Sequence, residues 1–222
     1  NNKILNMKNI GLETASILLK IKCVSFSTKK KFRLTSGKES PVYCDCRRII
    51  SYPTEREKLI NFGVKKIEET QSLAKINNIA GGESAGIPFA SFIASKMKLP
   101  MCYVRKEKKK FGKTSQIEGN LNLKDKVLLV EDLMTDGGSK IKFIQALKKA
   151  NANVKGIFVI FNYGINDSFL KYNREKIKLI SLTSWKDIIS VGLKKNLINS
   201  KDLKIIIKFL DSISVKNLKS FL

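Results

Sequence analysis

The stretch VLLVEDLMTDGGSK, residues 127–140, sets the organisation of the chain. Its first four residues are apolar, which is typical of a strand buried on both faces of a parallel sheet. Two adjacent carboxylates, Glu131 and Asp132, follow this strand, and a turn rich in small residues then leads into an amphipathic segment. Strand, polar turn and helix in this order predict a parallel α/β unit, in which ligands bind where the strands end.

The same alternation of strand and helix extends along most of the chain. The spacing of apolar residues predicts helices over 7–24, 54–76, 87–97 and 138–150, and strands over 79–80, 101–104, 127–130 and 154–161. Short strands and turns are expected over 24–47, and two further helices over 184–222. Strands separated by helices imply a mostly parallel sheet with helices on both faces, and 222 residues fit a single domain of this α/β class.

The chain carries 43 Lys and Arg against 19 Asp and Glu, a formal net charge of +24. Only six of the basic residues are arginine, the residue that base-edge readout favours, and basic and aromatic residues do not alternate as they do in single-strand binders. We therefore expect most lysines on solvated faces, where they attract small polyanions, and we expect no nucleic acid partner. A basic nucleic-acid-binding domain is the alternative from a different class, and the lysine excess is its sole support.

Other residue types narrow the chemistry and the compartment. No apolar run approaches the roughly 20 residues of a membrane span, and the first residues do not read as a secretory signal, so we expect a cytoplasmic protein without a membrane partner. Four cysteines without a CxxC pair predict buried free thiols rather than zinc or disulfides. The absence of histidine removes the commonest general base and the commonest metal ligand.

The turn after the two acids has the composition of a phosphate site. It consists of Thr135, Asp136, Gly137, Gly138 and Ser139. Glycines allow successive N–H groups to point inward, and the following helix adds partial positive charge. Neither the P-loop nor the GxGxxG pattern is present, and the alternative is a helix cap with nothing bound. The acids favour the phosphate site, because a sugar phosphate would place its hydroxyls, or a divalent cation, on Glu131 and Asp132.

Three further segments complete a pattern known from one family. FRLTSGKESPVYCDCRRIISYP at 32–53 contains an SGxxSPxYxDxR segment, GGESAG at 81–86 follows a strand, and RKEKKKFGKTSQIEG at 105–119 is a basic loop with Gly112 as a possible hinge. Together with 127–140, these motifs resemble those of the orotate phosphoribosyltransferases among the type I phosphoribosyltransferases, and the similarity runs from about 11 to 161. A solvated charge run is the alternative for the basic loop.

The resemblance implies a fold and a reaction. The fold would be a central, mostly parallel sheet flanked by helices, with an N-terminal helix and hood over 1–53, a core over 54–165 and C-terminal helices over 166–222. The reaction would transfer the 5-phosphoribosyl group of phosphoribosyl pyrophosphate to orotate, giving orotidine 5′-phosphate and pyrophosphate in pyrimidine biosynthesis. Mg²⁺ would be held through substrate oxygens, with Glu131 and Asp132 as candidate ligands. The enzyme would be a homodimer whose basic loop reaches the neighbouring subunit's site.

The resemblance also implies roles for single residues. Arg105, Lys106 and Lys109 of the basic loop would be catalytic and would bind the pyrophosphate. The other residues that would bind phosphoribosyl pyrophosphate are Glu131 and Asp132 at the ribose hydroxyls, Thr135, Asp136, Gly137, Gly138 and Ser139 at the 5-phosphate, and Glu83, Ser84 and Ala85, whose backbone N–H groups would face the pyrophosphate. The orotate pocket would contain Ser36, Gly37, Tyr43, Arg47 and Thr135.

The chain departs from the family pattern at four positions. Thr35, Ala85, Phe111 and Tyr163 stand where members carry Lys, Lys, His and Arg. Arg47 or Arg33 would then bind the orotate carboxylate. The nearest alternative is a phosphoribosyltransferase for purines or xanthine, or a regulator that only binds phosphoribosyl pyrophosphate. Such a protein would share the site at 131–139 and lack the SGxxSPxY segment.

Overall fold

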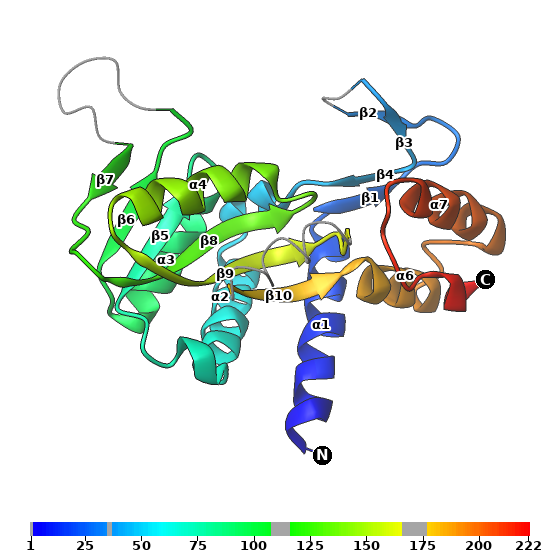
Figure 1. Ribbon diagram of the computed structural model, residues 1–222. Coiled ribbons are helices and arrows are strands. Elements are labelled where there is room, and N and C mark those ends of the chain that lie inside the picture. The colour runs from blue at the N-terminus through cyan, green and yellow to red at the C-terminus, as the bar shows by residue number, and fades with distance from the viewer. Residues whose placement is uncertain (1, 35–36, 108–115, 166–176) are drawn as a thin grey trace.

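The computed structural model describes residues 2–34, 37–107, 116–165 and 177–222. The centre of this part of the chain is a six-stranded sheet in the order β10-β9-β8-β5-β6-β7 (Figure 1). The strands are β5 (Asn78–Gly82), β6 (Met101–Val104), β7 (Ile117–Gly119), β8 (Lys126–Met134), β9 (Asn153–Asn162) and β10 (Lys178–Ser184). Neighbouring strands are parallel except β6 and β7, which are antiparallel. The predicted mostly parallel sheet is therefore confirmed.

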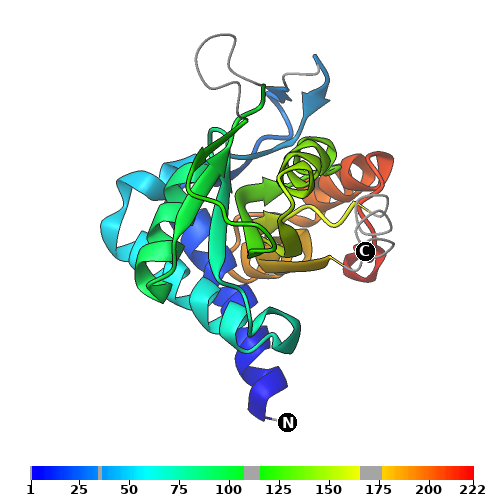
Figure 2. The ribbon, with the colours of Figure 1, turned by 60° about the vertical axis from the view of Figure 1, so that its left-hand side comes forward.

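Helices cover both faces of the sheet (Figures 1 and 2). On one face pack α1 (Asn2–Lys20), α2 (Pro53–Glu68) and α3 (Gly86–Met97), and on the other packs α4 (Gly138–Lys149). After β10, α6 (Trp185–Lys194) and α7 (Ser200–Ser212) lie at one end of the sheet, followed by a short 3₁₀ helix, η3 (Lys219–Phe221). The two helices expected after residue 184 are thus present.

The sequences of β8 and β9 explain this layering, because side chains alternate between the two faces of a strand. Leu128 and Val130 of β8 belong to the core beneath α1, α2 and α3. Val127 and Leu129 belong to the core beneath α4, together with Phe143 of that helix. Since both faces are covered, the strands are apolar along most of their length, and each fully buried aliphatic side chain stabilises the fold by about 1.5–3 kcal/mol.

A small N-terminal layer lies beside the carboxyl ends of β8 and β9 (Figure 1). In it, β1 (Val24–Phe26) pairs with β4 (Val42–Cys44), and β2 (Phe32–Arg33) pairs with β3 (Glu39–Ser40). The 3₁₀ helix η1 (Cys46–Ser51) then leads to α2 and contacts β8. We refer to the described residues of 24–51 as the hood.

Two helices end earlier than predicted, and α1 also begins earlier, at Asn2 rather than at 7. α1 ends at Lys20 rather than at 24, because Lys22 adopts a left-handed φ of 56° and turns the chain into β1. α2 ends at Glu68 rather than at 76, and the 3₁₀ helix η2 (Gln71–Leu73) follows it. The predicted helices over 87–97 and 138–150 agree with α3 and α4 to within one residue.

The sheet is larger than predicted. β8 continues to Met134 because its second half pairs with the ten-residue β9, so Glu131 and Asp132 lie within the strand and not after it. β10 and β7 were not predicted. The sequence of β10, KLISLTS, shows only a short alternation of apolar and polar residues, and β7 lies in a segment expected to be loop.

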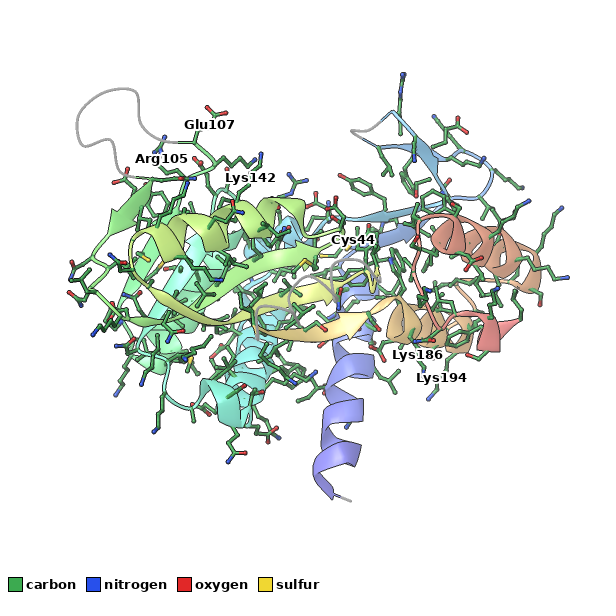
Figure 3. All side chains as sticks on the ribbon, viewed as in Figure 1. Cys44, Arg105, Glu107, Lys142, Lys186 and Lys194 are labelled. Carbon is green, nitrogen blue, oxygen red and sulfur yellow. The ribbon has the colours of Figure 1, made fainter. Side chains whose placement is uncertain are left out.

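Predictions from composition can also be compared with the structure. All four cysteines are free and buried, as expected. The side chains of Lys142, Lys186 and Lys194 extend from different parts of the surface (Figure 3). Within the described ranges, no helix combines the length and the hydropathy that a membrane crossing requires.

Candidate active site

Glu131 and Asp132 are neighbours in β8, and their side chains therefore point to opposite faces of the sheet. Glu131 lies on the α4 face, where it meets Lys140. Asp132 lies on the hood face, close enough to Cys46 and Arg47 to interact electrostatically with both. The exposed fractions of the two acids are 4% and 7%. The two acids, which were expected to lie together after the strand, therefore lie within β8 with one side chain on each face.

The carboxylate of Glu131 fills a notch that two glycines leave open. A Cβ atom at Gly82 would lie 1.7 Å from Glu131 Oε1, and a Cβ at Gly86 would lie 3.2 Å from the same oxygen. On the other side, Lys140 Nζ lies 3.4 Å from Glu131 Oε2, and Lys140 is only 8% exposed. Glu131 Oε1 itself has no hydrogen-bond partner among the described residues.

Burial raises the pKa of Glu131 from its ordinary 4.5 to about 7. The ammonium of Lys140, and to a smaller extent that of Lys106, opposes this rise. Burial also raises the pKa of Asp132, and Lys140 is again the main group that opposes the change. Buried carboxylates with perturbed pKa values beside a loop-rich edge are typical of functional sites.

The turn between β8 and α4 is exposed at Asp136, Gly138 and Ser139. Gly137 has a left-handed φ of 77° and directly precedes α4. The Asp136 carboxylate accepts hydrogen bonds from the Gly138 N–H at 3.2 Å and from the Thr135 hydroxyl at 3.3 Å. Asp136 therefore occupies one of the N–H groups expected to cradle a phosphate, and a phosphate bound to that group would displace its carboxylate.

The loop after β5 lies beside the start of the loop after β6, because these two strands are neighbours. The Glu83 N–H donates to the Val104 carbonyl at 2.9 Å, so it is already bonded, which corrects the expectation that it faces the pyrophosphate. The Glu83 carboxylate accepts a hydrogen bond from the Lys106 N–H at 2.7 Å. Ser84 is exposed and Ala85 is half-buried, and the role of their N–H groups stays a prediction.

Arg105 and Lys106 lead out of β6 at the edge of the sheet (Figure 3 labels Arg105). Arg105 forms an ion pair of 3.8 Å with Glu118 of β7. Lys106 is exposed, and its positive charge is one of the influences that lower the pKa of Glu131. Lys109, Phe111 and the proposed hinge Gly112 lie outside the described residues.

The hood brings two of the residues predicted for orotate to the Asp132 side of β8. Tyr43 is 38% exposed, and its ring centre lies 5.5 Å from that of Phe32. Arg47 donates two hydrogen bonds, of 2.7 and 3.0 Å, to the Asp45 carboxylate, so its charge is already paired. Gly37 is exposed with a φ of 79°, and Ser36 and Thr35 lie outside the described residues.

Tyr163, one of the departures from the family pattern, packs in an aromatic cluster. Its ring centre lies 5.4 Å from that of Phe161 and 5.3 Å from that of Trp185. Burial raises the pKa of its hydroxyl far above the ordinary value. These contacts support packing as the role of Tyr163.

Gly82 and Lys140 belong to the site but were not predicted to do so. The paired glycines at the end of β5 are a weak signal for close contact with another chain segment. Lys140 gave no signal, because it is one of many lysines and only the fold places it against Glu131.

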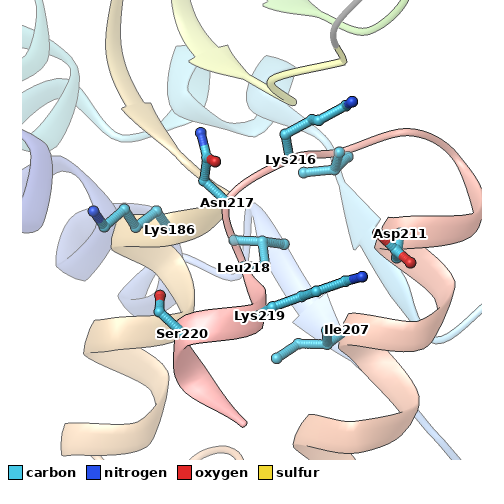
Figure 4. A pocket seen from close by; sticks show the side chains of 9 residues that line it. Lys186, Ile207, Asp211, Lys216, Asn217, Leu218, Lys219 and Ser220 are labelled. Atoms are coloured by element: carbon cyan, nitrogen blue, oxygen red, sulfur yellow. The ribbon is translucent and has the colours of Figure 1, made fainter.

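A cavity of about 520 Å³ lies elsewhere, between α7, the start of α6 and the C-terminal segment (Figure 4). None of its lining residues belongs to the predicted site. The side chains of Lys186, Lys216 and Lys219 point in different directions, so they do not converge on one anion (Figure 4).

Comparisons with known proteins bear on this site and fold. The model of the phosphoribosyl transferase domain family matches residues 54–191. The orotate phosphoribosyltransferase of Jannaschia sp. is 42% identical over 206 residues, which cover 92% of this chain and 90% of the relative. The crystal structure of orotate phosphoribosyltransferase from Aeropyrum pernix superposes with a TM-score of 0.69 at 28% identity, covering 83% of this chain and 99% of that one. Leishmania donovani UMP synthase gives a TM-score of 0.74 at 28% identity, with 90% of this chain matching 42% of the longer one.

The chain therefore belongs to the phosphoribosyltransferase family. The parallel sheet, the acids in β8 and the turn before α4 are the features of this class of protein. The relatives that match most of its length have one activity in common. Within the family, the chain is therefore a member of the orotate phosphoribosyltransferases of pyrimidine biosynthesis. The resemblance drawn from the four motifs is confirmed.

Proposed function

We propose that this chain transfers the 5-phosphoribosyl group from phosphoribosyl pyrophosphate to orotate at the carboxyl end of β8. One observation carries the proposal. The β8 acids, the turn before α4, the loop after β5 and the first residues after β6 converge at one edge of the sheet, with the hood beside Asp132. A sugar with a phosphate at one end and a pyrophosphate at the other requires such a row of neighbouring subsites.

The acids and the turn would divide the sugar phosphate between them. The 5-phosphate would lie on residues 135–139, where the N-terminus of α4 favours an anion. The ribose hydroxyls would donate to Glu131 and Asp132. Glu131 Oε1 supports this role, because a buried acceptor without a partner among the described residues costs about 1–3 kcal/mol, which a bound hydroxyl would relieve.

The transfer itself needs positioning and cations rather than a protein nucleophile. A ring nitrogen of orotate would bond to the anomeric carbon as the bond from that carbon to the pyrophosphate oxygen breaks. Orientation of two bound reactants can supply on the order of 7–11 kcal/mol. Negative charge grows on the departing pyrophosphate, and Arg105 and Lys106, with Lys109 as the third predicted cation, would stabilise it.

Mg²⁺ fits this site as an ion held mainly by the substrate. The described residues hold no cluster of three or more potential metal ligands, whereas the hard oxygens of pyrophosphate and ribose can hold the ion. Mg²⁺ bound in this way would neutralise charge on the leaving group. The two acids would then orient the hydroxyls that share the ion.

We further propose a cytoplasmic homodimer in which the basic loop is shared across the interface: Lys106 at its start serves its own subunit's site, and the loop beyond it serves the neighbouring site. The position of Arg105 and Lys106 supports this proposal. Both follow β6, next to the edge strand β7, so the chain leaves the sheet at its periphery (Figure 1).

The ultraviolet absorbance of orotate tests the reaction directly. Folded protein with orotate, phosphoribosyl pyrophosphate and Mg²⁺ should consume orotate and release pyrophosphate in equal amounts. Adenine, hypoxanthine and xanthine offered in place of orotate test the nearest alternative. Turnover of one of these bases without turnover of orotate would replace the proposed acceptor, and no turnover with any base would contradict the enzymatic proposal.

A further inference from the structure

One side chain joins the two loops that flank the proposed pyrophosphate position. Glu83 is the first residue after β5, and Lys106 is the second residue after β6. The Glu83 N–H donates to the Val104 carbonyl at 2.9 Å, and Glu83 Oε2 accepts the Lys106 N–H at 2.7 Å. Glu83 thus forms hydrogen bonds both with Val104, the last residue of β6, and with Lys106, two residues further along the chain.

Gln116, the residue before β7, holds the same backbone from the other side. Its side-chain amide donates to the Arg105 carbonyl at 2.9 Å and approaches the Lys106 carbonyl at 3.5 Å. The Arg105 N–H in turn donates to the Gln116 carbonyl at 2.8 Å. The backbone of Arg105 and Lys106 is therefore fixed on both sides, and the remaining freedom of Lys106 lies in its side chain.

A carboxylate at position 83 is unfavourable for binding of the negatively charged pyrophosphate. Its presence there therefore calls for a separate benefit. Glu83 is half-buried at the start of the loop whose Ser84 and Ala85 are predicted to face the pyrophosphate. A negative group there repels the ligand, by about 1 kcal/mol at 4 Å even in bulk water. A carboxylate, however, accepts a stronger hydrogen bond from an N–H group than an uncharged side chain does. The bond to Lys106 uses this property.

We propose that Glu83 is a positioning residue that fixes the backbone of Lys106 and so directs the Lys106 ammonium toward the departing pyrophosphate. This inference rests on the proposed function for the role of Lys106, whereas the hydrogen bond can be tested without it. In this role Glu83 acts through Lys106 and not on the reacting atoms themselves. It couples the loop after β5 to the loop after β6, so that both sides of the pyrophosphate subsite keep one relative position.

Three variants separate the hydrogen bond from the charge. Glu83→Ala removes the acceptor, and kcat should fall about 10- to 100-fold while KM for orotate stays unchanged, since small misplacements of catalytic groups cost rates of this size. Glu83→Gln keeps an acceptor oxygen without the charge, and its kcat should lie between those of the wild type and Glu83→Ala. Glu68→Ala removes an exposed acid at the end of α2 and should leave kcat unchanged.

Amide hydrogen exchange supplies a readout that does not depend on activity. The Lys106 N–H should exchange faster in Glu83→Ala than in the wild type, and Glu83→Gln should restore much of the protection. Unchanged exchange in Glu83→Ala would overturn the inference, and so would a kcat for Glu83→Gln as low as that for Glu83→Ala. If the wild type turned over no substrate, the proposed function would fail, and the exchange rates would still decide whether Glu83 holds Lys106.

Discussion

Replacing Lys140 with methionine should destabilise the protein, and the loss should grow with pH. Lys140 Nζ lies 3.4 Å from Glu131 Oε2, and the exposed fractions of the two side chains are 9% and 5%. Methionine fills much of the same space but leaves Glu131 without its cation. At an effective dielectric constant of about 20, the Coulomb attraction lost at this distance is about 5 kcal/mol. This is the largest loss to expect, and it applies only if Glu131 stays ionised in the variant.

Proton uptake by Glu131 reduces this loss at low pH. Folding raises the pKa of Glu131 from 4.5 to about 7, so the contribution of Glu131 to stability is largest below pH 4.5 and falls as the pH rises toward 7, by about 3 kcal/mol in total. Lys140 lowers the folded-state pKa, and its removal therefore moves that pKa upward and extends the fall to higher pH. Above pH 7 each pH unit adds up to about 1.4 kcal/mol, so the pH-dependent loss in Lys140→Met should be close to zero at pH 6 and should reach at most about 3 kcal/mol at pH 9.

Urea unfolding followed by circular dichroism at pH 6, 7.5 and 9 measures this difference. Lys142→Met is the matched control, because Lys142 lies on the same helix with its side chain exposed (Figure 3). Its stability should follow the wild type at every pH. Equal losses in the two variants, or a loss in Lys140→Met that shrinks as the pH rises, would refute the reasoning about the buried pair.

Other perturbations test the remaining parts of the site. Gly82→Ala should lower both the melting temperature and kcat, because its Cβ would lie 1.7 Å from a carboxylate oxygen. Gly138→Ala should melt like the wild type in calorimetry, because its Cβ would lie 3.7 Å from the Asp136 carboxylate, an ordinary contact distance. Arg47→Ala should raise the KM for orotate about tenfold and not that for phosphoribosyl pyrophosphate; an unchanged KM would move the orotate carboxylate elsewhere. Chelation of Mg²⁺ should stop turnover without changing the circular dichroism spectrum, and added Mg²⁺ should restore it. Lys109→Ala and Asp132→Asn, each inactive alone, should regain about a quarter of wild-type activity when mixed, because half of the dimers would be mixed with one complete site each; no regain would place Lys109 in its own subunit's site.

The sequence predicts the order of elements in the core because the signals for them are local. An apolar run such as 127–130 identifies a strand covered on both faces, and the paired glycines before α4 mark where that helix begins. The hood motif and the basic loop also predict orotate as the phosphoribosyl acceptor, because their residue patterns are specific to one family. The comparisons place the chain in that same family.

The parts that sequence could not predict depend on contacts between distant segments. β8 extends past Val130 only because β9 continues beside it, and β10 forms an edge strand only because β9 offers a free side. The split of Glu131 and Asp132 between two faces follows from this extension, since a loop would not impose alternation. Lys140 and the carboxylate of Glu83 acquire their partners through the packing of α4 and of β6, which no local pattern reveals.

The fit between Gly82 and Glu131 also implies a rule of covariation. Close-packed contacts conserve volume, so a carboxylate one methylene shorter at position 131 would free space at position 82. Related chains with aspartate at 131 are therefore expected to accept alanine or a larger residue at 82, whereas chains with glutamate should keep glycine. A chimera that exchanges only the β5 loop or only the β8 strand between such relatives would carry a clash or a hole at this contact. We therefore expect the β5 loop and the β8 strand to vary together among related chains.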